Sequence, residues 1–225
     1  EVYILVLPAF GLISSVVSGI VQLVLFGNLS MILAMSCISL LGSIVWAHHM
    51  FTAGLISDTR AYFMSVTMII SIPTGSKIFN WLSTYLGSNA IFSMISTSAV
   101  FFVTIFLMMF IIGGSTGVIL GNVAVDISLH DTYYVVTHFH FVLSLGTVIA
   151  IFSGIMFFQD QLLISSGYLP TSTSSLSRYH LVVTFVGILL TFTPMHFLAF
   201  NVLPRRIEEY HDYLNSWNYM VSIGS

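Results

Sequence analysis

The chain has 225 residues, of which 57% are hydrophobic and only 6% are charged, and its mean hydropathy is +1.01. Its formal net charge of −3 is small and dispersed, with no basic cluster beyond Arg205 and Arg206. This composition indicates a membrane protein and excludes both a soluble globular core and a nucleic-acid-binding surface. The single cysteine, Cys37, lies in an apolar run and supports neither a disulfide framework nor a cysteine-based metal site.

Apolar runs long enough to cross a bilayer follow one another along the chain. A spanning helix needs about 20 apolar residues, and six runs reach that length, while a seventh starts near Trp217. The sequence therefore predicts an all-α polytopic transmembrane helix bundle, a single membrane domain over residues 1–225, in contact with membrane lipid. The six runs are Val2–Phe26, Met31–Leu55, Ala61–Leu82, Ile91–Leu120, Tyr133–Phe158 and Tyr179–Leu203. Because both ends of the chain fall in or beside hydrophobic segments, we expect it to be a piece of a larger membrane protein.

Three prolines fall inside these runs and predict kinks. Pro8, Pro73 and Pro194 each lack the N–H that would bond to the carbonyl four residues earlier. Such breaks are tolerated in a membrane where neighbouring helices or water satisfy the freed carbonyls.

Nearly all the ionisable residues fall at helix ends that share one side of the membrane. Successive spanning helices alternate in direction. The starts of the first, third and fifth runs and the ends of the second, fourth and sixth runs therefore lie on the same side of the membrane. Ionisable groups inside a membrane are costly and usually pair, bind metal or carry protons. Scattered core histidines would not be expected to gather in this way. The layer comprises Glu1, Tyr3, His48, His49, Asp58, Arg60, Asp126, His130, Asp131, His138, His140, His196, Arg205 and Arg206.

Two adjacent histidines, His48 and His49, stand at the end of the second run. Regular helix geometry separates neighbouring side chains by about 100°. Both imidazoles can therefore reach one metal only if the helix loosens there, and imidazole suits copper, iron and zinc. The alternative is one interfacial and one snorkelling histidine.

The stretch from His130 to His140 holds three histidines and a carboxylate at the entry to an apolar run. His138 and His140 are two residues apart, which places them about 200° apart on a helix. They cannot chelate one metal together, but each could hold a different cofactor on its own side of the helix. One buried histidine bonded to a neighbouring helix is the simpler alternative, which three histidines in eleven residues disfavour.

Two further groups have both a functional and a simpler interpretation. Lys77 is a proton-path residue, with Thr74 on the same helical face and Ser14 on the first run, or a lysine snorkelling to the headgroups. Asp126, His130 and Asp131 suit a divalent ion such as Mg²⁺ or Mn²⁺, or they are a solvated loop with helix-capping carboxylates.

Several motifs together resemble subunit I of the haem-copper oxygen reductases, above all its mitochondrial, cytochrome c-oxidising branch. They are Glu-Val-Tyr at 1–3, Trp-Ala-His-His-Met at 46–50, Asp-Thr-Arg-Ala-Tyr-Phe at 58–63, Ile-Pro-Thr-Gly-Ser-Lys at 72–77, Leu-His-Asp-Thr-Tyr-Tyr-Val-Val-Thr-His-Phe-His at 129–140 and Pro-Arg-Arg at 204–206. The resemblance spans the chain in the family's order, and the 129–140 stretch is highly specific. It implies that the chain is a fragment of a twelve-helix subunit, from the sixth helix onward.

The resemblance also implies a role for each site residue. His48 and His49 would bind the copper of the binuclear centre (CuB), His138 the oxygen-binding haem a3, and His140 the low-spin haem a. Tyr3 and Glu1 would serve oxygen cleavage and proton delivery, Ser14, Thr74 and Lys77 a second proton path, and Thr67 would be a hydroxyl near haem a3. His130 and Asp131 would hold Mg²⁺, and Asp126, Arg205 and Arg206 would contact haem propionates.

The implied activity is the reduction of O₂ to water coupled to proton pumping. The implied partners are the N-terminal half of subunit I, which would supply the remaining copper and haem histidines, subunits II and III, and cytochrome c through subunit II. The implied location is the mitochondrial inner membrane, or alternatively a bacterial plasma membrane. Alternative functions are a quinol oxidase, a nitric oxide reductase, which Tyr3, Lys77 and Glu1 argue against, and a non-enzymatic proton-relay transporter.

Overall fold

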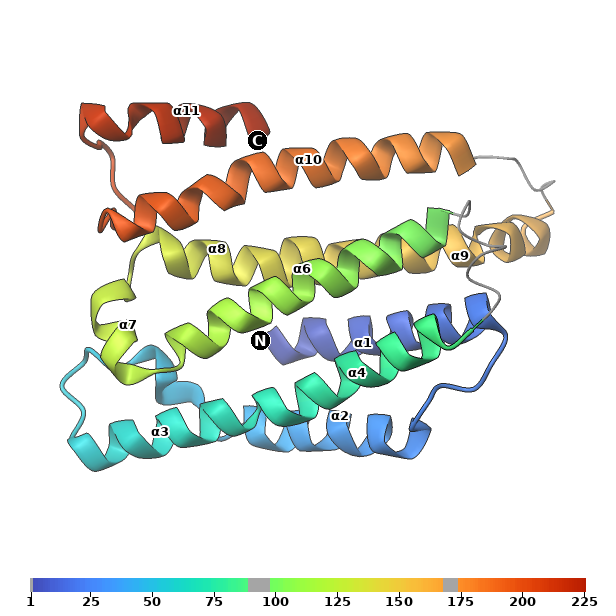
Figure 1. Ribbon diagram of the computed structural model, residues 1–225, viewed down its shortest axis with the longest axis horizontal. Helices are drawn as coiled ribbons and strands as arrows, with labels where there is room; N and C mark the ends of the chain where they lie inside the picture. Colours follow the sequence, from blue (N-terminus) through green and yellow to red (C-terminus); the bar gives the residue numbers. More distant parts are fainter. Residues whose placement is uncertain (1, 89–97, 168–173) are drawn as a thin grey trace.

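The computed structural model describes residues 2–88, 98–167 and 174–225, so Glu1 lies outside the described residues (Figure 1). These ranges are mainly helical, as the composition predicts. The α-helices are α1 (Val2–Val21), α2 (Asn28–Gly42), α3 (Ser57–Ile69), α4 (Ser71–Leu86), α6 (Ser98–Leu120), α7 (Val123–Leu129), α8 (Tyr133–Val142), α9 (Ile149–Ser165), α10 (Ser174–Phe200) and α11 (Asn215–Gly224). The 3₁₀-helices η1 (Trp46–His49) and η3 (Asp212–Leu214) and the π-helix η2 (Leu143–Val148) complete the order.

The described ranges contain four continuous helices that are long and apolar enough to cross a membrane. These are Val2–Val21, Ser98–Leu120, Tyr133–Gln159 and Leu176–Phe200. The bundle predicted from the sequence is therefore confirmed as a class, but two of the six predicted runs differ from a single long helix. The run Met31–Leu55 forms an α-helix only as far as Gly42, and the run Ala61–Leu82 is divided between α3 and α4.

The division between α3 and α4 has a local cause. Pro73 has no N–H to donate to the carbonyl of Ile69, which is the last residue of α3. The backbone bonds on either side are long, with 3.4 Å from Ile70 N to Val66 O and 3.4 Å from Thr74 N to Ile70 O. By contrast, α1 and α10 continue through Pro8 and Pro194.

The main hydrophobic core forms around α1, which packs against α4, α6, η2 and α9. The α1 residues Ile13, Val16 and Val17 are fully buried. Phe10 packs edge to face with Trp81 of α4 and Phe110 of α6, at ring-centroid distances of 5.2 and 5.1 Å. These contacts fix α4 and α6 against α1.

One end of the bundle brings together four segments that are distant in the sequence. In Figure 1 the turn containing η1, helix α7, the start of α8 and the end of α10 all lie at the left end of the view. Backbone bonds join two of them, from Tyr133 N to Leu203 O at 3.2 Å and from Arg205 N to Asp131 O at 2.8 Å. The alternation predicted from the sequence therefore places most of the ionisable layer at this end.

Candidate metal and cofactor centre

His48 and His49 turn their imidazoles toward the same point. They lie in the 3₁₀-helix η1, so the backbone is not a regular α-helix here, which is the loosening that joint metal binding requires. Their Nε2 atoms are 2.9 Å apart. If an ion were bound to both nitrogens at the usual distance of about 2.0 Å, the angle between the two nitrogens at the ion would be about 90°. Two imidazole nitrogens in this arrangement fit a copper or other first-row transition ion.

The other ring nitrogen of His48 faces the hydroxyl of Thr67 on α3, with 3.2 Å between Nδ1 and Oγ1. Thr67 donates its own proton to the carbonyl of Phe63 at 2.6 Å, so its oxygen accepts from His48 Nδ1–H. This bond selects the tautomer in which Nε2 carries no proton and keeps its lone pair. Metal-binding histidines usually have such an outer partner.

His138 is directed from α8 toward α6. Its Nδ1 is 2.9 Å from the carbonyl oxygen of Gly113 and 3.3 Å from Thr116 Oγ1, which leaves Nε2 free. Gly117 lies against the Cε1 edge of the ring, because a Cβ built there would be only 2.5 Å from Cε1 of His138. The absence of a side chain at Gly117 therefore makes room for the imidazole.

His140 faces the other way, toward α10. Its ring stacks on Phe192 at 4.2 Å between centroids, and its Nδ1 donates to the carbonyl of Val136 at 2.7 Å. Nε2 is again the free nitrogen. The two histidines therefore lie against different helices, as their spacing of two residues predicts.

Asp126, His130 and Asp131 form a chain of weak contacts beside these histidines. His130 Nδ1 is 3.7 Å from Asp126 Oδ2, and His130 Nε2 is 3.5 Å from Asp131 Oδ2. Asp131 also accepts a bond of 2.7 Å from Nε of Arg205, while Arg206 is exposed. Burial raises the pKa of Asp126, and the nearby imidazole of His130 opposes that effect.

The predicted Mg²⁺ ligands do not complete a site by themselves. Among the described residues, no group of three or more His, Cys, Asp or Glu side chains is placed to hold a metal ion. Asp131 is engaged by Arg205, so His130 and Asp131 would need further ligands from outside these ranges.

The predicted proton-path residues lie deeper in the bundle. Lys77 is 1% exposed, and its Nζ has no hydrogen-bond partner among the described residues. Thr74 donates its hydroxyl to the carbonyl of Ile70 at 2.9 Å, and Ser14 donates to that of Phe10 at 2.7 Å. The buried position of Lys77 disagrees with a lysine that snorkels to the headgroups.

Tyr3 packs its ring against α2. A Cβ built at Gly42 would be 2.7 Å from Cδ2 and Cε2 of Tyr3, so this glycine allows the close contact. Sequence reasoning missed Gly42, Gly113 and Gly117, although glycine inside an apolar helix can signal the close approach of another group.

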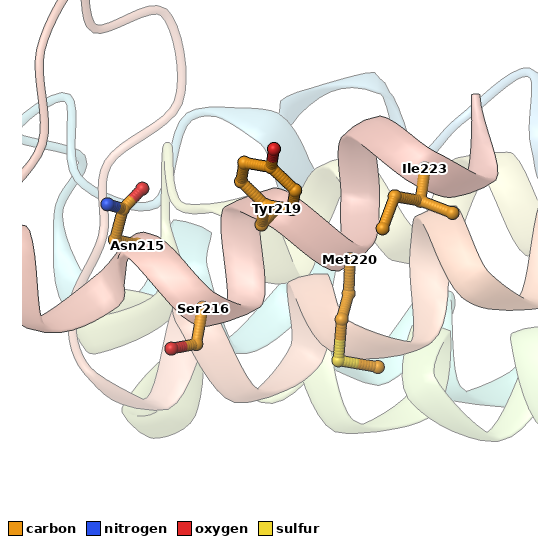
Figure 2. Close-up of a pocket in the computed structure, with 5 residues that line it drawn as sticks. All are labelled: Asn215, Ser216, Tyr219, Met220 and Ile223. Atoms are coloured by element: carbon orange, nitrogen blue, oxygen red, sulfur yellow. The ribbon is translucent and has the colours of Figure 1, made fainter.

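A shallow hollow on α11 is separate from these residues. It is lined by Asn215, Ser216, Tyr219, Met220 and Ile223, and Figure 2 shows Tyr219 and Met220 projecting to different sides of the helix. Its lining contains no His, Cys, Asp or Glu side chain, and it is not part of the candidate centre.

Comparison with known proteins places these features in a family context. The profile of the family described as cytochrome c and quinol oxidase polypeptide I matches residues 1–225. Curated relatives named cytochrome c oxidase subunit 1 are 56% identical over 225 residues in Plasmodium falciparum and 45% identical over 227 residues in Theileria annulata. Each match covers all of this chain, but only 46% and 45% of the relative, so the chain spans less than half their length.

A solved structure supports the fold. The chain is similar to a haem-copper terminal oxidase dimer determined by electron cryomicroscopy, with a TM-score of 0.81 over 99% of this chain and 44% of that one. The sequence identity is 19%, so this similarity establishes the helical architecture alone.

Proposed function

Because the chain belongs to the cytochrome c and quinol oxidase polypeptide I family, we propose that it is part of the catalytic subunit of a proton-pumping oxidase that reduces O₂ to water. The observation that carries the proposal is the orientation of four imidazoles. His48 and His49 share one point, while His138 and His140 diverge, and three of the four have an Nδ1 hydrogen bond that leaves Nε2 without a proton. This arrangement fits one copper ion and two haem irons.

The residues then take the following places. His48 and His49 hold the copper, His138 binds the iron of haem a3, and His140 binds that of haem a. When bound, these groups supply electron transfer and oxygen chemistry, while the protein sets their ligation, electrostatics and proton supply. Asp126, Arg205 and Arg206 belong to segments at the same end of the bundle as these histidines. They are the proposed contacts for the haem propionates.

Protons reach the centre along the α1–α4 interface. Lys77 carries them from the interior, Ser14 and Thr74 provide hydroxyls along the way, and Tyr3 receives them. This role suits a buried lysine without a protein hydrogen-bond partner better than ligation does, since an ammonium cannot bind a metal. Glu1 is proposed as a gate for a separate path, on the family resemblance alone.

The described imidazoles leave the centre incomplete. A copper ion bound here would receive two nitrogens from this chain and each haem iron would receive one, whereas the family resemblance implies a third histidine for the copper and a second for the low-spin haem. We propose that the remaining part of subunit I supplies the others, and that subunits II and III complete the complex. Cytochrome c, reaching the complex through subunit II, is the proposed electron donor, and Mg²⁺ is proposed between subunits I and II at His130 and Asp131.

The relatives are from eukaryotes, and with the four apolar helices this supports a multi-pass protein of the mitochondrial inner membrane. The test is purification of the complex that contains this chain. It should show absorption by two distinct haems and consume O₂ with reduced cytochrome c. Activity with a quinol but not with cytochrome c would show that the donor is a quinol. A complex without haem would contradict the proposed function and favour a proton-relay transporter.

A further inference from the structure

Trp81 joins two separate parts of the proposed proton path. It is fully buried on α4, one helical turn after Lys77, so the two side chains share a face. Its indole N–H donates to Oγ of Ser14 on α1, at 2.9 Å. The inference that follows rests on the proposed function, in which Lys77 and Ser14 carry protons.

The Lys77 ammonium is enclosed by two aromatic rings. Its Nζ lies 5.4 Å from the ring centroid of Phe10 and 5.0 Å from that of Trp81. Both distances are within the cation–π limit of about 6 Å. The rings themselves pack edge to face, inclined at 66°. They form two walls that limit where the flexible lysine stem can place its charge.

The orientation of the Ser14 hydroxyl is set by two bonds. Ser14 donates its proton to the carbonyl of Phe10 at 2.7 Å, and its oxygen accepts the indole proton of Trp81. Indole nitrogen is a donor only, so the direction of the second bond cannot reverse. One acceptor position remains on Ser14 Oγ, and Trp81 determines where that position lies.

We propose that Trp81 is a positioning residue for proton transfer, which holds Lys77 by its ring and Ser14 by its N–H. In this arrangement Trp81 keeps the Lys77 amine and the Ser14 hydroxyl at a constant relative position across the α1–α4 interface. The alternative is that Trp81 only fills space, since it also packs against Phe106 at 5.7 Å between ring centroids. The two roles differ in what happens when the N–H alone is removed.

The experiment uses the complete oxidase complex carrying Trp81→Phe. This variant retains an aromatic ring but removes the donor to Ser14. The measured quantity is the rate at which the donor reduces the oxygen-binding haem under anaerobic conditions, followed optically beside the low-spin haem. We expect about a fivefold slower reduction of the oxygen-binding haem, the factor that a lost hydrogen bond represents, with the low-spin haem unaffected.

A double-mutant cycle separates positioning from packing. If Trp81 acts through Ser14, then adding Trp81→Phe to Ser14→Ala should not slow the reduction of the oxygen-binding haem any further. Phe106→Leu is the matched control, because the Phe106 ring packs on Trp81 and Phe110, whereas the Lys77 amine lies over the rings of Phe10 and Trp81, and it should leave the reduction rate unchanged. Equal slowing by Phe106→Leu, or costs that multiply independently in the double variant, would overturn the proposal.

A second variant covers a Trp81→Phe complex that fails to bind haem. Phe10→Leu removes one ring from Lys77 and keeps the Trp81–Ser14 bond, and it should slow the reduction about threefold. A normal rate in Phe10→Leu or in Trp81→Phe, while Lys77→Met remains slow, overturns the positioning role and leaves the proposed function intact. A normal rate in Lys77→Met would contradict the proton path itself.

Discussion

The Nε2 atoms of His48 and His49 face each other at 2.9 Å, on the 3₁₀-helix Trp46–His49, which the short segment 43–45 separates from the end of α2. Two neutral imidazoles gain little from such an approach unless one donates to the other. A metal ion between them would use both lone pairs at once. The first two predictions below test this interpretation.

Removal of either ring should remove the copper. We expect His48→Ala or His49→Ala to lower the copper content of the purified complex by one ion per complex, because one protein nitrogen is lost from a site with few ligands. Elemental analysis gives the number directly. His211→Ala is the control, since His211 is exposed and its ring stacks on Tyr213, away from the His48–His49 pair. Unchanged copper in both variants would show that the pair is not a ligand set.

The outer partner of His48 should affect the same metal more weakly. Thr67→Val preserves the shape of the side chain and removes the oxygen that accepts from Nδ1. Loss of such a partner lowers metal affinity by about 10- to 100-fold, and competition with a chelator would measure the change. Thr104→Val, which disturbs the bond to Tyr85 instead, should leave copper binding as it is. Equal copper retention in the two variants would separate Thr67 from the site.

Gly117 should tolerate no side chain, whereas its neighbour Gly114 should accept one. A methyl at Gly117 would be 2.5 Å from the ring of His138, which is held at Nδ1 by Gly113, while a methyl at Gly114 meets nothing within 4 Å. Overpacking of this kind costs about 1–3 kcal/mol. The high-spin haem spectrum of Gly117→Ala should therefore be weakened or shifted, and that of Gly114→Ala should match the wild type. Identical spectra for both variants would contradict the close fit at His138.

The sequence predicted the parts of this fold that depend on pattern. Helix-length apolar runs predicted the bundle, and the spacing of His138 and His140 predicted that they lie on different sides of α8. Alternation of helix direction placed most of the histidines at one end, with His180 near the start of α10 as an exception. These features follow from helix geometry and from the cost of charge in a membrane, which are both local properties of the sequence.

Other features depend on contacts that a single sequence does not contain. The α-helix of the second run ends at Gly42, where Tyr3 from α1 packs closely, and the π-helix Leu143–Val148 has no proline to signal it. Pro73 predicted a kink near Ile70. It did not predict that the run would divide there into two helices. The bond from Trp81 to Ser14 joins positions 67 residues apart, and only the packing of α1 on α4 brings them together.

Lys77→Met should slow reduction of the binuclear centre without loss of haem. Methionine retains the buried stem and removes the amine that is proposed to carry protons, so the haem spectra should be normal while turnover falls. Stopped-flow measurement of haem reduction in the wild type and in Lys77→Met gives the two rates to compare. Normal turnover in Lys77→Met would show that this buried lysine serves packing alone.

The optical spectra of the His138 and His140 variants show whether each face of α8 holds its own haem. We expect His138→Ala to lose the oxygen-reactive haem and keep the low-spin haem, and His140→Ala to do the reverse, because the two imidazoles face α6 and α10 separately. Binding of carbon monoxide to the reduced complex distinguishes the two haems. If assembled complexes of both variants retained both haem signals, or if each lost the two haems equally, the assignment of one haem to each face of α8 would be wrong.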